Sequence, residues 1–413
     1  MISSIFRKRA LRSPLLAAVF VMSVVYDPGI WGAAAQPSST ASNASFEAFL
    51  QELWPEAERK GVTRSTFDQA FAGVTPDPRV IALTRNQPEY GKPVGTYIET
   101  MASQARIDAG LRQATQQSSV LDAVEQRFGV DRWVILAIWG IETSFGAEPI
   151  RWDIIRSLST FAQAHYRDPF FRDELIAALK ILQDGHLSRD QLLGSWAGAM
   201  GQPQFMPSTY IKFALAFSGN GKPNIWTSVP DVLASIANYL NKAGWKPGLP
   251  WGFEVVVPAN FDYRRSRASF QEWANLGVMR ADGGAYPPTG DAILFFPSCA
   301  SGPAFLVTEN FLAIKRYNNS DVYALAAGQL ANRMRGEGPI RAPWPPEDRQ
   351  LTLAERIGLQ QKLAALGYDV HDFQGRFDFD LRDSIRDVQA KFGFLPDGCP
   401  TAALLDRLGV TAQ

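Results

Sequence analysis

The stretch RWVILAIWGIETSFG, residues 132–146, contains one of the most apolar runs of the chain and places a carboxylate, Glu142, at the end of that run. On a helix, Ile138 and Trp139 lie one turn before Glu142 on the same face, and the other faces of the segment are also apolar. This pattern predicts a helix at the centre of a domain. Burial disfavours the charged form of a carboxyl and raises its pKa, which suits a general acid near neutral pH.

A structural role for Glu142 is the alternative that this segment leaves open. A glutamate at a helix end can reach solvent, or it can pair with an arginine such as Arg151 or Arg156. A second segment, GSWAGAMGQPQFMPSTY over residues 194–210, favours a functional role. Its small residues permit close approach of a ligand, and its serine, glutamines and aromatic rings suit a sugar, although such segments more often serve tight helix packing.

Composition indicates an ordered chain with one large core and a smaller one. Of the 413 residues, 46% are apolar and 20% are charged. Helical periodicity dominates from residue 46 to about residue 245, and short β-branched and aromatic runs follow over residues 248–316. The predicted fold is therefore mainly α, with a small β element on a helical body.

The first 35 residues have the order of a secretory signal. Four basic residues precede a twelve-residue apolar run, Leu15–Tyr26, and small alanines follow at 33–35. The apolar run is shorter than the roughly 20 residues that span a bilayer, so we expect cleavage, with an uncleaved N-terminal anchor as the alternative. Residues 36–45 are small and polar, and we expect them to be disordered.

Charge and the placement of histidines exclude several classes of function. Removal of residues 1–35, which hold four Lys or Arg and one Asp, leaves 37 basic and 40 acidic residues and a net charge of −3. Nucleic acid is therefore not an expected partner. The histidines His165, His186 and His371 form no metal-ligand cluster and pair with no cysteine motif, so we expect neither a zinc site nor Cys–His catalysis.

A proline-rich segment separates a small C-terminal unit from the rest. Residues 336–350 carry four prolines and are predicted to be a semi-rigid linker. Residues 351–413 show three helical segments with apolar stripes, separated by turns that contain glycine. Cys299 and Cys399 lie 100 residues apart in the two units, and the sequence provides no distance that decides whether they pair.

Five segments occur in the order that is typical of one enzyme family. They are GIETSFG with Glu142, GSWAGAMGQPQFMPSTY, FSGNGKPNIW, SIANYLNKAGW and RYNNSDVYAL. Over residues 46–335 the chain therefore resembles the membrane-bound lytic murein transglycosylase B family. The resemblance implies a lysozyme-like α+β catalytic domain that acts on peptidoglycan glycan strands. Residues 351–413 are similar to the small three-helix peptidoglycan-binding domain of cell-wall enzymes, with a helical dimer module as the alternative.

The resemblance also implies roles for individual residues. Glu142 would be the catalytic acid and base. Ser195 and Gln204 would contact the muramic-acid sugar. Four further residues would line the cleft: Tyr239, Tyr317, Asn318 and Tyr323. Tyr97 is also implied as a substrate-binding residue and is the weakest match.

The implied reaction needs one carboxyl and no cofactor. Glu142 protonates the oxygen between N-acetylmuramic acid and N-acetylglucosamine. It then removes the proton of the muramic C6 hydroxyl, which attacks its own C1 to form a 1,6-anhydro ring. A hydrolytic muramidase is one alternative and would need a second carboxylate, for which Glu148 and Asp153 are near in sequence. A non-catalytic wall-binding scaffold is the other.

Some members of this family bind calcium in an EF-hand-like loop, and the present sequence departs from that loop. It has Ala216 where an acidic ligand would open the loop, Asn220 at an inner position and Lys222 at another. A cationic side chain among oxygen ligands opposes calcium binding. We therefore expect the loop to keep its turn and to hold no metal.

The signal segment and the resemblance together indicate where the protein acts. We expect a secreted, periplasmic protein whose partner is peptidoglycan. A monomer is expected, and peripheral association with the inner or the outer membrane stays open.

Overall fold

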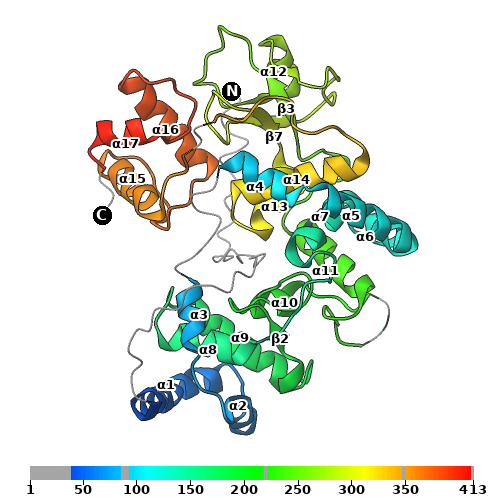
Figure 1. Cartoon of the computed structure of the whole chain (residues 1–413), viewed down its shortest axis with the longest axis vertical. Helices are drawn as coiled ribbons and strands as arrows, with labels where there is room; N and C mark the ends of the chain where they lie inside the picture. Colours follow the sequence, from blue (N-terminus) through cyan, green and yellow to red (C-terminus); the bar gives the residue numbers. More distant parts are fainter. Residues whose placement is uncertain (1–38, 85–92, 218, 220, 347–348, 411–413) are drawn as a thin grey trace.

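The structure is a computed structural model that describes residues 39–84, 93–217, 219, 221–346 and 349–410 (Figure 1). The predicted signal, residues 1–35, lies outside the described residues, as does Asn220. Among the helices of the described ranges, none has both the length and the apolar character needed to cross a bilayer.

Helices build most of the molecule, as the periodicity predicts. At one end of Figure 1 lie α1 (Ser39–Arg59), α2 (Arg64–Phe71) and α3 (Pro78–Leu83), together with α8 (Ile154–Gln163) and α9 (Phe170–Gln183). The other helices of the body are α4 (Val94–Met101), α5 (Gln104–Gln116), α6 (Ser118–Phe128), α7 (Arg132–Thr143), α10 (Pro207–Phe213), α11 (Val229–Lys242), α12 (Phe270–Asn275), α13 (Glu309–Tyr317) and α14 (Asp321–Arg335).

Helix α7 is the central helix that the apolar run predicts. Residues 135–138 are fully buried, and the helix packs against α5, α6, α11 and α14. Its start is capped by Asp131, whose carboxylate accepts a hydrogen bond from the Trp133 backbone N–H at 2.8 Å. Its end is set by Ser144 and Phe145, whose positive φ angles of 48° and 61° cannot continue a right-handed helix. The helix therefore stops just beyond its carboxylate.

The β element is a small antiparallel sheet that is buried on both faces. In the described part of the chain its strand order is β4 (Arg267–Ser269), β6 (Asp291–Phe295), β7 (Ala304–Val307), β3 (Gly252–Val256) and β5 (Met279–Arg280). Side chains alternate along a strand, so Ile293 and Phe295 join the main core while Ala292 and Leu294 join a second core on the other face. A separate short pair, β1 (Trp152–Asp153) and β2 (Leu193–Gly194), leads into the segment that suits a sugar.

The N-terminal boundary corrects one prediction. Residues 36–45 are predicted to be disordered, but residues 39–45 form the first turns of α1. The later turns of this helix are anchored by the buried side chains of Phe46, Phe49 and Leu53. Once a helix is nucleated, each further residue adds a backbone hydrogen bond, so an anchored helix can extend backwards through a polar segment.

The C-terminal unit contains the predicted helical segments as α15 (Leu353–Ala365), α16 (Phe379–Lys391) and α17 (Ala402–Leu408). They enclose a small core of their own. Its buried members include Leu359, Leu363, Ile385, Val388 and Leu404. This unit lies beside the sheet, where the Arg386 guanidinium donates to the Leu294 carbonyl of β6 at 3.0 Å. Figure 1 shows the unit at one side of the body.

The C-terminal unit is docked on the body. Phe379, from α16, packs on Phe295 and Phe311 with ring centroids 5.6 and 6.2 Å apart. Beside this contact, the Arg382 guanidinium pairs with the Asp321 carboxylate at 2.8 Å. The two units therefore share an apolar contact and an ion pair.

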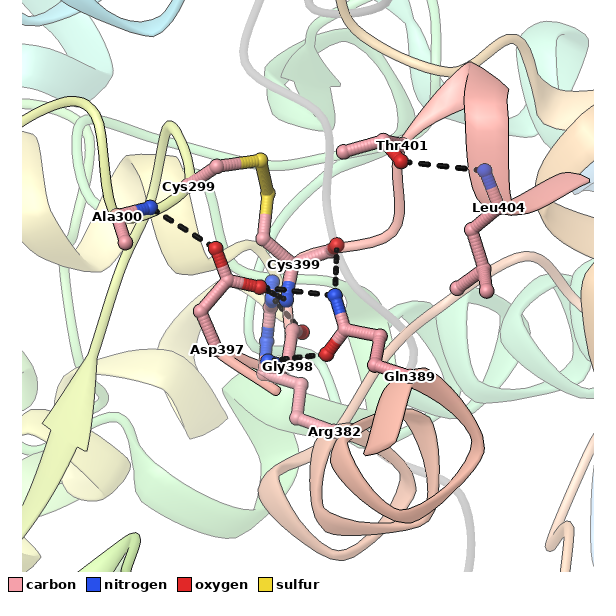
Figure 2. Close-up of a disulfide and its surroundings, with 9 residues drawn as sticks. All are labelled: Cys299, Ala300, Arg382, Gln389, Asp397, Gly398, Cys399, Thr401 and Leu404. Atoms are coloured by element: carbon pink, nitrogen blue, oxygen red, sulfur yellow. Dashed lines mark hydrogen bonds between the residues drawn. A yellow bond between two sulfur atoms is a disulfide. The ribbon is translucent and has the colours of Figure 1, made fainter. Parts of the chain in front are cut away.

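A disulfide also joins the two units, which answers a question that the sequence leaves open. Cys299 and Cys399 are bonded across 100 residues, with their Cα atoms 5.0 Å apart. Figure 2 shows Asp397 beside this bond, where its carboxylate accepts hydrogen bonds from the backbone N–H groups of Ala300 and Cys399, both at 2.9 Å. The amide of Gln389 donates to the same carboxylate at 2.9 Å, so the turn that carries the disulfide is held from several sides.

The proline-rich segment corrects a second prediction, because its described part is a fixed strap, residues 336–346. Ile340 and Trp344 pack against the main core, and the backbone N–H of Ala342 donates to the Glu254 carboxylate at 2.7 Å. The prediction of a semi-rigid linker is wrong in this respect. Proline content indicates stiffness, whereas the isoleucine and the tryptophan supply the apolar anchors that hold the strap down.

A buried carboxyl on α9 determines how stability should change with pH. Burial raises the pKa of Glu174 to about 7, although the backbone N–H and the hydroxyl of Ser208 donate hydrogen bonds to its carboxyl at 2.8 and 2.6 Å. Between the ordinary pKa of 4.5 and this raised value, the unfolded chain has released a proton that the folded protein still holds. The free energy of unfolding should therefore fall as the pH rises through this window.

Glu174→Gln tests this expectation, because glutamine keeps the hydrogen-bonding groups and removes the titration. Between about pH 5 and pH 8, we expect the variant to lose less stability than the wild type, by about 2 kcal/mol. Urea unfolding at the two pH values measures the difference. Identical losses in the two proteins would show that Glu174 does not titrate in this range.

Candidate active site

Glu142 lies at the buried end of α7, where α14 packs against it. Glu142 is 5% exposed, and the hydroxyl of Tyr323, on α14, donates a hydrogen bond to its Oε1 at 2.6 Å. Tyr323 is itself held at the start of α14, where the Ser320 hydroxyl accepts a hydrogen bond from its backbone N–H at 3.2 Å. The structure therefore presents Glu142 as a buried and oriented carboxyl, not as a solvated helix end.

The start of α14 is anchored by a buried charge. Asp321, whose side chain is 9% exposed, pairs with Lys315 at 2.6 Å and with Arg382 at 2.8 Å. Burial alone would raise the pKa of Asp321, but these two cations lower it to about 2. Arg382 belongs to the C-terminal unit, so this unit helps to hold the helix that carries Tyr323.

The loop that follows β2 is tied to the end of α7 by Gln202. The buried side chain of Gln202 accepts a hydrogen bond from the Trp139 indole N–H at 2.8 Å and donates one to the Trp226 carbonyl at 2.7 Å. Its backbone carbonyl accepts the Thr143 hydroxyl at 2.9 Å. A Cβ atom on Gly146 would collide with the Gln202 amide, so this position requires glycine. The sequence does not single out Gln202 among the neutral polar residues of this segment. In the structure its hydrogen bonds connect the loop to α7, the helix that carries Glu142.

The same loop carries Ser195 and Gln204, two of the predicted substrate-binding residues. Ser195 is half-buried, and its hydroxyl accepts a hydrogen bond from the Ala199 backbone N–H at 3.2 Å. Gln204 is buried with a positive φ of 52°, and its amide donates to the Gly201 carbonyl at 2.8 Å. A non-glycine residue with positive φ is uncommon and indicates a turn that its surroundings hold firmly.

Three of the predicted tyrosines form a buried group next to Glu142. The Tyr317 hydroxyl donates to the Pro203 carbonyl at 2.6 Å, and the ring of Tyr239 lies against that of Tyr317 with centroids 4.8 Å apart. Burial raises the pKa of Tyr317 and Tyr323 well above the ordinary value for tyrosine, and the nearby charge of Glu142 raises both further. These phenols therefore stay protonated and act as hydrogen-bond donors.

The last two predicted residues flank this group. Asn318 follows α13 directly and is 1% exposed. Tyr97, on α4, is half-buried and lies near Tyr323. The structure thus gathers the predicted aromatic residues around Glu142, but it buries most of them where the resemblance implies a cleft lining.

The two carboxylates that follow Glu142 in sequence have other roles. Glu148 is exposed and accepts a hydrogen bond from the Ser144 hydroxyl at 3.2 Å. Asp153 caps α8 by accepting the Arg156 backbone N–H at 2.9 Å, and it also pairs with Arg189. Asp153 is therefore engaged in holding local structure, and Glu148 is a solvent-exposed group.

Arg106, on α5, supports the candidate site in a way that the sequence pattern does not indicate. Its guanidinium donates to the Gly140 carbonyl at 3.1 Å and to the carbonyls of Thr100 and Met101, both at 2.8 Å. These bonds tie the end of α4, the helix of Tyr97, to the last turn of α7. Bonds to backbone carbonyls leave no signature in a sequence, so only the structure reveals this role.

The loop between α10 and α11 is described apart from residues 218 and 220, and internal hydrogen bonds hold its described part. The buried carboxylate of Asp231 accepts the backbone N–H groups of Phe217 and Asn224, both at 2.9 Å, and the Lys222 ammonium donates to the Asp184 carbonyl. No group of three or more His, Cys, Asp or Glu side chains that could hold a metal occurs within the described residues. The described part of the turn is held by hydrogen bonds, and the Lys222 ammonium is engaged by a carbonyl outside the loop.

Calcium should therefore leave the thermal stability unchanged. An ion that binds only the folded state raises the melting temperature by mass action, by about 2.7 kcal/mol of stability at a hundredfold excess over Kd. We expect the same melting temperature in excess calcium and in a chelator, measured by differential scanning fluorimetry. A calcium-dependent rise of several degrees would show that the loop retains a site.

Comparison with known proteins identifies relatives of both units. Residues 45–332 match the family model of the transglycosylase SLT domain, and residues 352–408 match that of a peptidoglycan binding domain. Membrane-bound lytic murein transglycosylase B of Escherichia coli (strain K12) is 34% identical over 306 residues, which cover 70% of this chain and 82% of that protein.

Solved structures are similar as well. SltB3 from Pseudomonas aeruginosa, in complex with NAG-anhNAM-pentapeptide, is 44% identical with a TM-score of 0.79, and the match covers 88% of this chain and 99% of that chain. The Escherichia coli lytic transglycosylase Slt35 in complex with calcium is 26% identical with a TM-score of 0.60, over 72% of this chain and 94% of that chain. These likenesses confirm the predicted lysozyme-like, mainly helical fold with a helical C-terminal unit.

Proposed function

The chain belongs to the transglycosylase SLT family, and from this membership we propose how its buried glutamate cleaves the glycan strand. It is a lytic murein transglycosylase, which breaks the β-1,4 bond between N-acetylmuramic acid and N-acetylglucosamine in peptidoglycan and leaves 1,6-anhydromuramic acid ends. The observation that carries the proposal is the buried carboxyl of Glu142, held by the Tyr323 hydroxyl at 2.6 Å.

Glu142 acts first as the acid. Its carboxyl transfers a proton to the glycosidic oxygen while the bond from that oxygen to C1 of the muramic residue breaks, and N-acetylglucosamine leaves with a free hydroxyl. A cationic centre remains at C1, which the oxygen of the neighbouring acetamido group can stabilise. The fixed hydrogen bond from Tyr323 orients the carboxyl, and the buried surroundings limit access of bulk water to C1.

Glu142 acts next as the base. Its carboxylate takes the proton of the C6 hydroxyl of the same muramic residue, and that oxygen forms a new bond to C1. The 1,6-anhydro ring closes, Glu142 regains its proton and no water is consumed. One carboxyl serves both steps, so neither the exposed Glu148 nor the helix-capping Asp153 is required.

The surrounding residues take roles that follow from where they lie. Ser195 and Gln204, on the loop tied to α7, would contact the muramic-acid sugar, and the half-buried Tyr97 would line the cleft. The more deeply buried residues would position Glu142 and the loop: Tyr239, Tyr317, Asn318 and Tyr323.

The location of the protein is also part of the proposal. We propose that residues 1–35 direct the chain to the periplasm and are then removed, and that the mature protein acts there as a monomer on peptidoglycan. The disulfide between Cys299 and Cys399 supports this location, because disulfides persist in oxidising compartments such as the periplasm.

Digestion of purified sacculi by the full chain tests the proposed function. The released muropeptides should end in a ring that borohydride does not reduce, because C1 is bonded to C6 oxygen. Release of mainly reducible ends would indicate a hydrolytic muramidase, and the absence of any release would indicate a wall-binding scaffold.

Tyr323→Phe removes the hydroxyl that holds Glu142 and keeps the buried ring. A hydrogen bond to a charged group contributes about 1.5–3 kcal/mol, so we expect kcat to fall about ten- to hundredfold. Tyr210→Phe is the matched control, since Tyr210 is also 1% exposed and its hydroxyl bonds the Pro223 carbonyl at 2.7 Å. A wild-type kcat for Tyr323→Phe would show that this hydroxyl does not position the acid.

A further inference from the structure

The α13–α14 junction, residues 315–323, connects two helices that carry implied site residues. Helix α13 ends at Tyr317, and α14 begins at Asp321. Tyr323 lies in the first turn of α14, and its hydroxyl donates to Glu142. The place of this hydroxyl depends on where the first turn of α14 lies. Groups that hold the junction therefore also position the acid.

A buried carboxylate fixes the start of α14 between two cations. The side chain of Asp321 is 9% exposed; its Oδ1 pairs with the Lys315 ammonium at 2.6 Å, and its Oδ2 pairs with the Arg382 guanidinium at 2.8 Å. Lys315 belongs to α13, and its ammonium also donates to the Phe377 carbonyl of the C-terminal unit at 3.0 Å. Arg382 lies on α16. The C-terminal unit therefore supplies one of the two cations and an acceptor for the other.

Arg382 is held in place by contacts with both units. Its Nη1 donates to the Gly398 carbonyl at 3.3 Å, directly before the disulfide-bonded Cys399 (Figure 2). Its guanidinium lies 5.0 Å from the centre of the Phe295 ring, on β6 of the body. The side chain of Arg382 is 11% exposed, so its guanidinium presents a fixed charge to Asp321.

Loss of the Arg382 charge would leave Asp321 with one cation. In the wild type, burial raises the pKa of Asp321 but the two cations lower it to about 2, so this carboxyl is charged at neutral pH. A buried charge that loses a partner is strongly unfavourable, and the structure around it moves to bring it toward water. Asp321 is the first residue of α14, so this movement would displace the first turn of the helix.

A small displacement of this turn is sufficient to affect the acid. The Tyr323 hydroxyl lies 2.6 Å from Glu142 Oε1, and an O–H···O hydrogen bond is kept only within roughly 2.5–3.0 Å between the oxygen atoms. Misplacement of a catalytic group by about 1 Å can lower a rate about a hundredfold. The position of Asp321 is therefore transmitted to Glu142 through one hydrogen bond.

We propose that Arg382 is a positioning residue for the cleavage of the glycan strand. It holds the start of α14 through Asp321, and α14 presents the Tyr323 hydroxyl to Glu142. The C-terminal unit is thereby part of the frame of the active site and not only an appended binding module. The inference rests on the proposed function, because the reaction that it concerns is the one proposed for Glu142.

Docking of the C-terminal unit does not depend on Arg382 alone. The disulfide joins the two units, and the ring of Phe379 is buried in the main core. At the same interface Arg267, on β4, pairs with Asp380 at 2.5 Å and with Asp383 at 3.2 Å. These pairs join α16 to the sheet and not to the α13–α14 junction. Arg267 is therefore a matched control residue for Arg382.

The test compares Arg382→Gln with Arg267→Gln in the oxidised full chain, with soluble glycan strands as the substrate. We expect Arg382→Gln to lower kcat about tenfold and to keep KM within about twofold, because the substrate still binds while the acid is misplaced. Arg267→Gln should retain the wild-type kcat. A wild-type kcat for Arg382→Gln would overturn the inference. Equal losses in the two variants would also overturn it, because docking in general would then set the rate.

Two further variants separate positioning from a loss of folded protein. In the Tyr323→Phe background the orienting hydroxyl is absent, so Arg382→Gln should lower kcat by less than about twofold there. A tenfold loss in that background would contradict the proposal, because the effect would not pass through Tyr323. Asp321→Asn breaks the same ion pair from the other side and should reproduce the loss of kcat. It carries the test if Arg382→Gln does not fold, and a wild-type kcat for Asp321→Asn would overturn the inference.

Hydrogen exchange of backbone amides provides a readout that does not depend on cleavage. Amides of residues 323–327 should exchange at least about tenfold faster in Arg382→Gln than in the wild type, and at the wild-type rate in Arg267→Gln. Unchanged exchange in Arg382→Gln would overturn the inference even if kcat fell, because α14 would not have been released.

These measurements separate the inference from the proposed function. Cleavage by the wild type together with an unchanged kcat in Arg382→Gln would overturn the inference and leave the catalytic role of Glu142 standing. The absence of cleavage by the wild type would overturn the proposed function, and the exchange rates would then decide whether Arg382 fixes the start of α14.

Discussion

Glu142→Gln is expected to lower the rate of sacculus digestion by at least about a hundredfold and to leave the fold intact. Glutamine has the shape of glutamate, and its carbonyl oxygen can still accept the hydrogen bond that Tyr323 donates. It can neither transfer a proton to the glycosidic oxygen nor take one from the C6 hydroxyl. The measurement is the rate at which soluble muropeptides are released, with a circular dichroism spectrum to establish that the variant is folded.

Glu148→Gln is the matched control for this variant. Glu148 is exposed, and its contact is with the Ser144 hydroxyl at 3.2 Å. If Glu142 alone serves as acid and base, Glu148→Gln retains the wild-type rate. Retained activity in a folded Glu142→Gln protein would remove Glu142 from the mechanism, and a hundredfold loss in Glu148→Gln would indicate a second catalytic carboxylate.

The second large effect concerns the bond between the two units. Replacement of Cys299 and Cys399 by serine should lower the free energy of unfolding by about 2–4 kcal/mol, because the disulfide restricts the unfolded chain. The disulfide closes a loop that spans 100 residues. Closing so long a loop greatly reduces the conformational entropy of the unfolded chain. The contact of Phe379 with Phe295 and Phe311 remains in the variant, so the native fold should persist at a lower stability.

Urea unfolding of the serine variant and of the oxidised wild type measures this difference. A thiol reductant is the internal control, since it should lower the wild type to the stability of the variant and leave the variant unchanged. Equal unfolding midpoints for the variant and the oxidised wild type would show that the docking contacts alone hold the two units together.

The central helix and the burial of Glu142 at its end could be predicted because both depend on local patterns. The apolar run before Glu142 has no polar face, and this is sufficient to place the helix in the core. Asp131 caps the start of α7, and the residues after Glu142 end it with positive φ angles, so the helix bounds are also local. The order of the motifs then indicates the family.

Contacts between distant segments could not be predicted, because they leave no local pattern. Tyr323 and Glu142 form a hydrogen bond across 181 residues, and no sequence pattern near either residue predicts this contact. The disulfide likewise depends on how the two units dock. Proline content predicted a linker, but the packing of Trp344 on the body decides that the segment is a strap.

The buried tyrosines show the same limit within the site. The resemblance implies that Tyr239 and Tyr317 line the cleft, and an aromatic ring at a sugar site does suggest stacking. In the structure their hydroxyls donate to backbone carbonyls and their rings contact each other. An aromatic side chain can contact a ligand, or it can support other residues that contact the ligand. Packing decides between these two roles, and periodicity and motif order do not specify packing.

The chemical form of the cleaved end tests the central claim most directly. Purified sacculi are digested by the full chain in ordinary water and in oxygen-18 water, and the muropeptides are weighed by mass spectrometry. We predict 1,6-anhydro ends that are about 18 mass units lighter than hydrolysed ends, that contain no heavy oxygen and that resist borohydride, because the C6 hydroxyl supplies the attacking oxygen. Reducible ends that carry the heavy oxygen as the main product would contradict the single-carboxyl mechanism at Glu142.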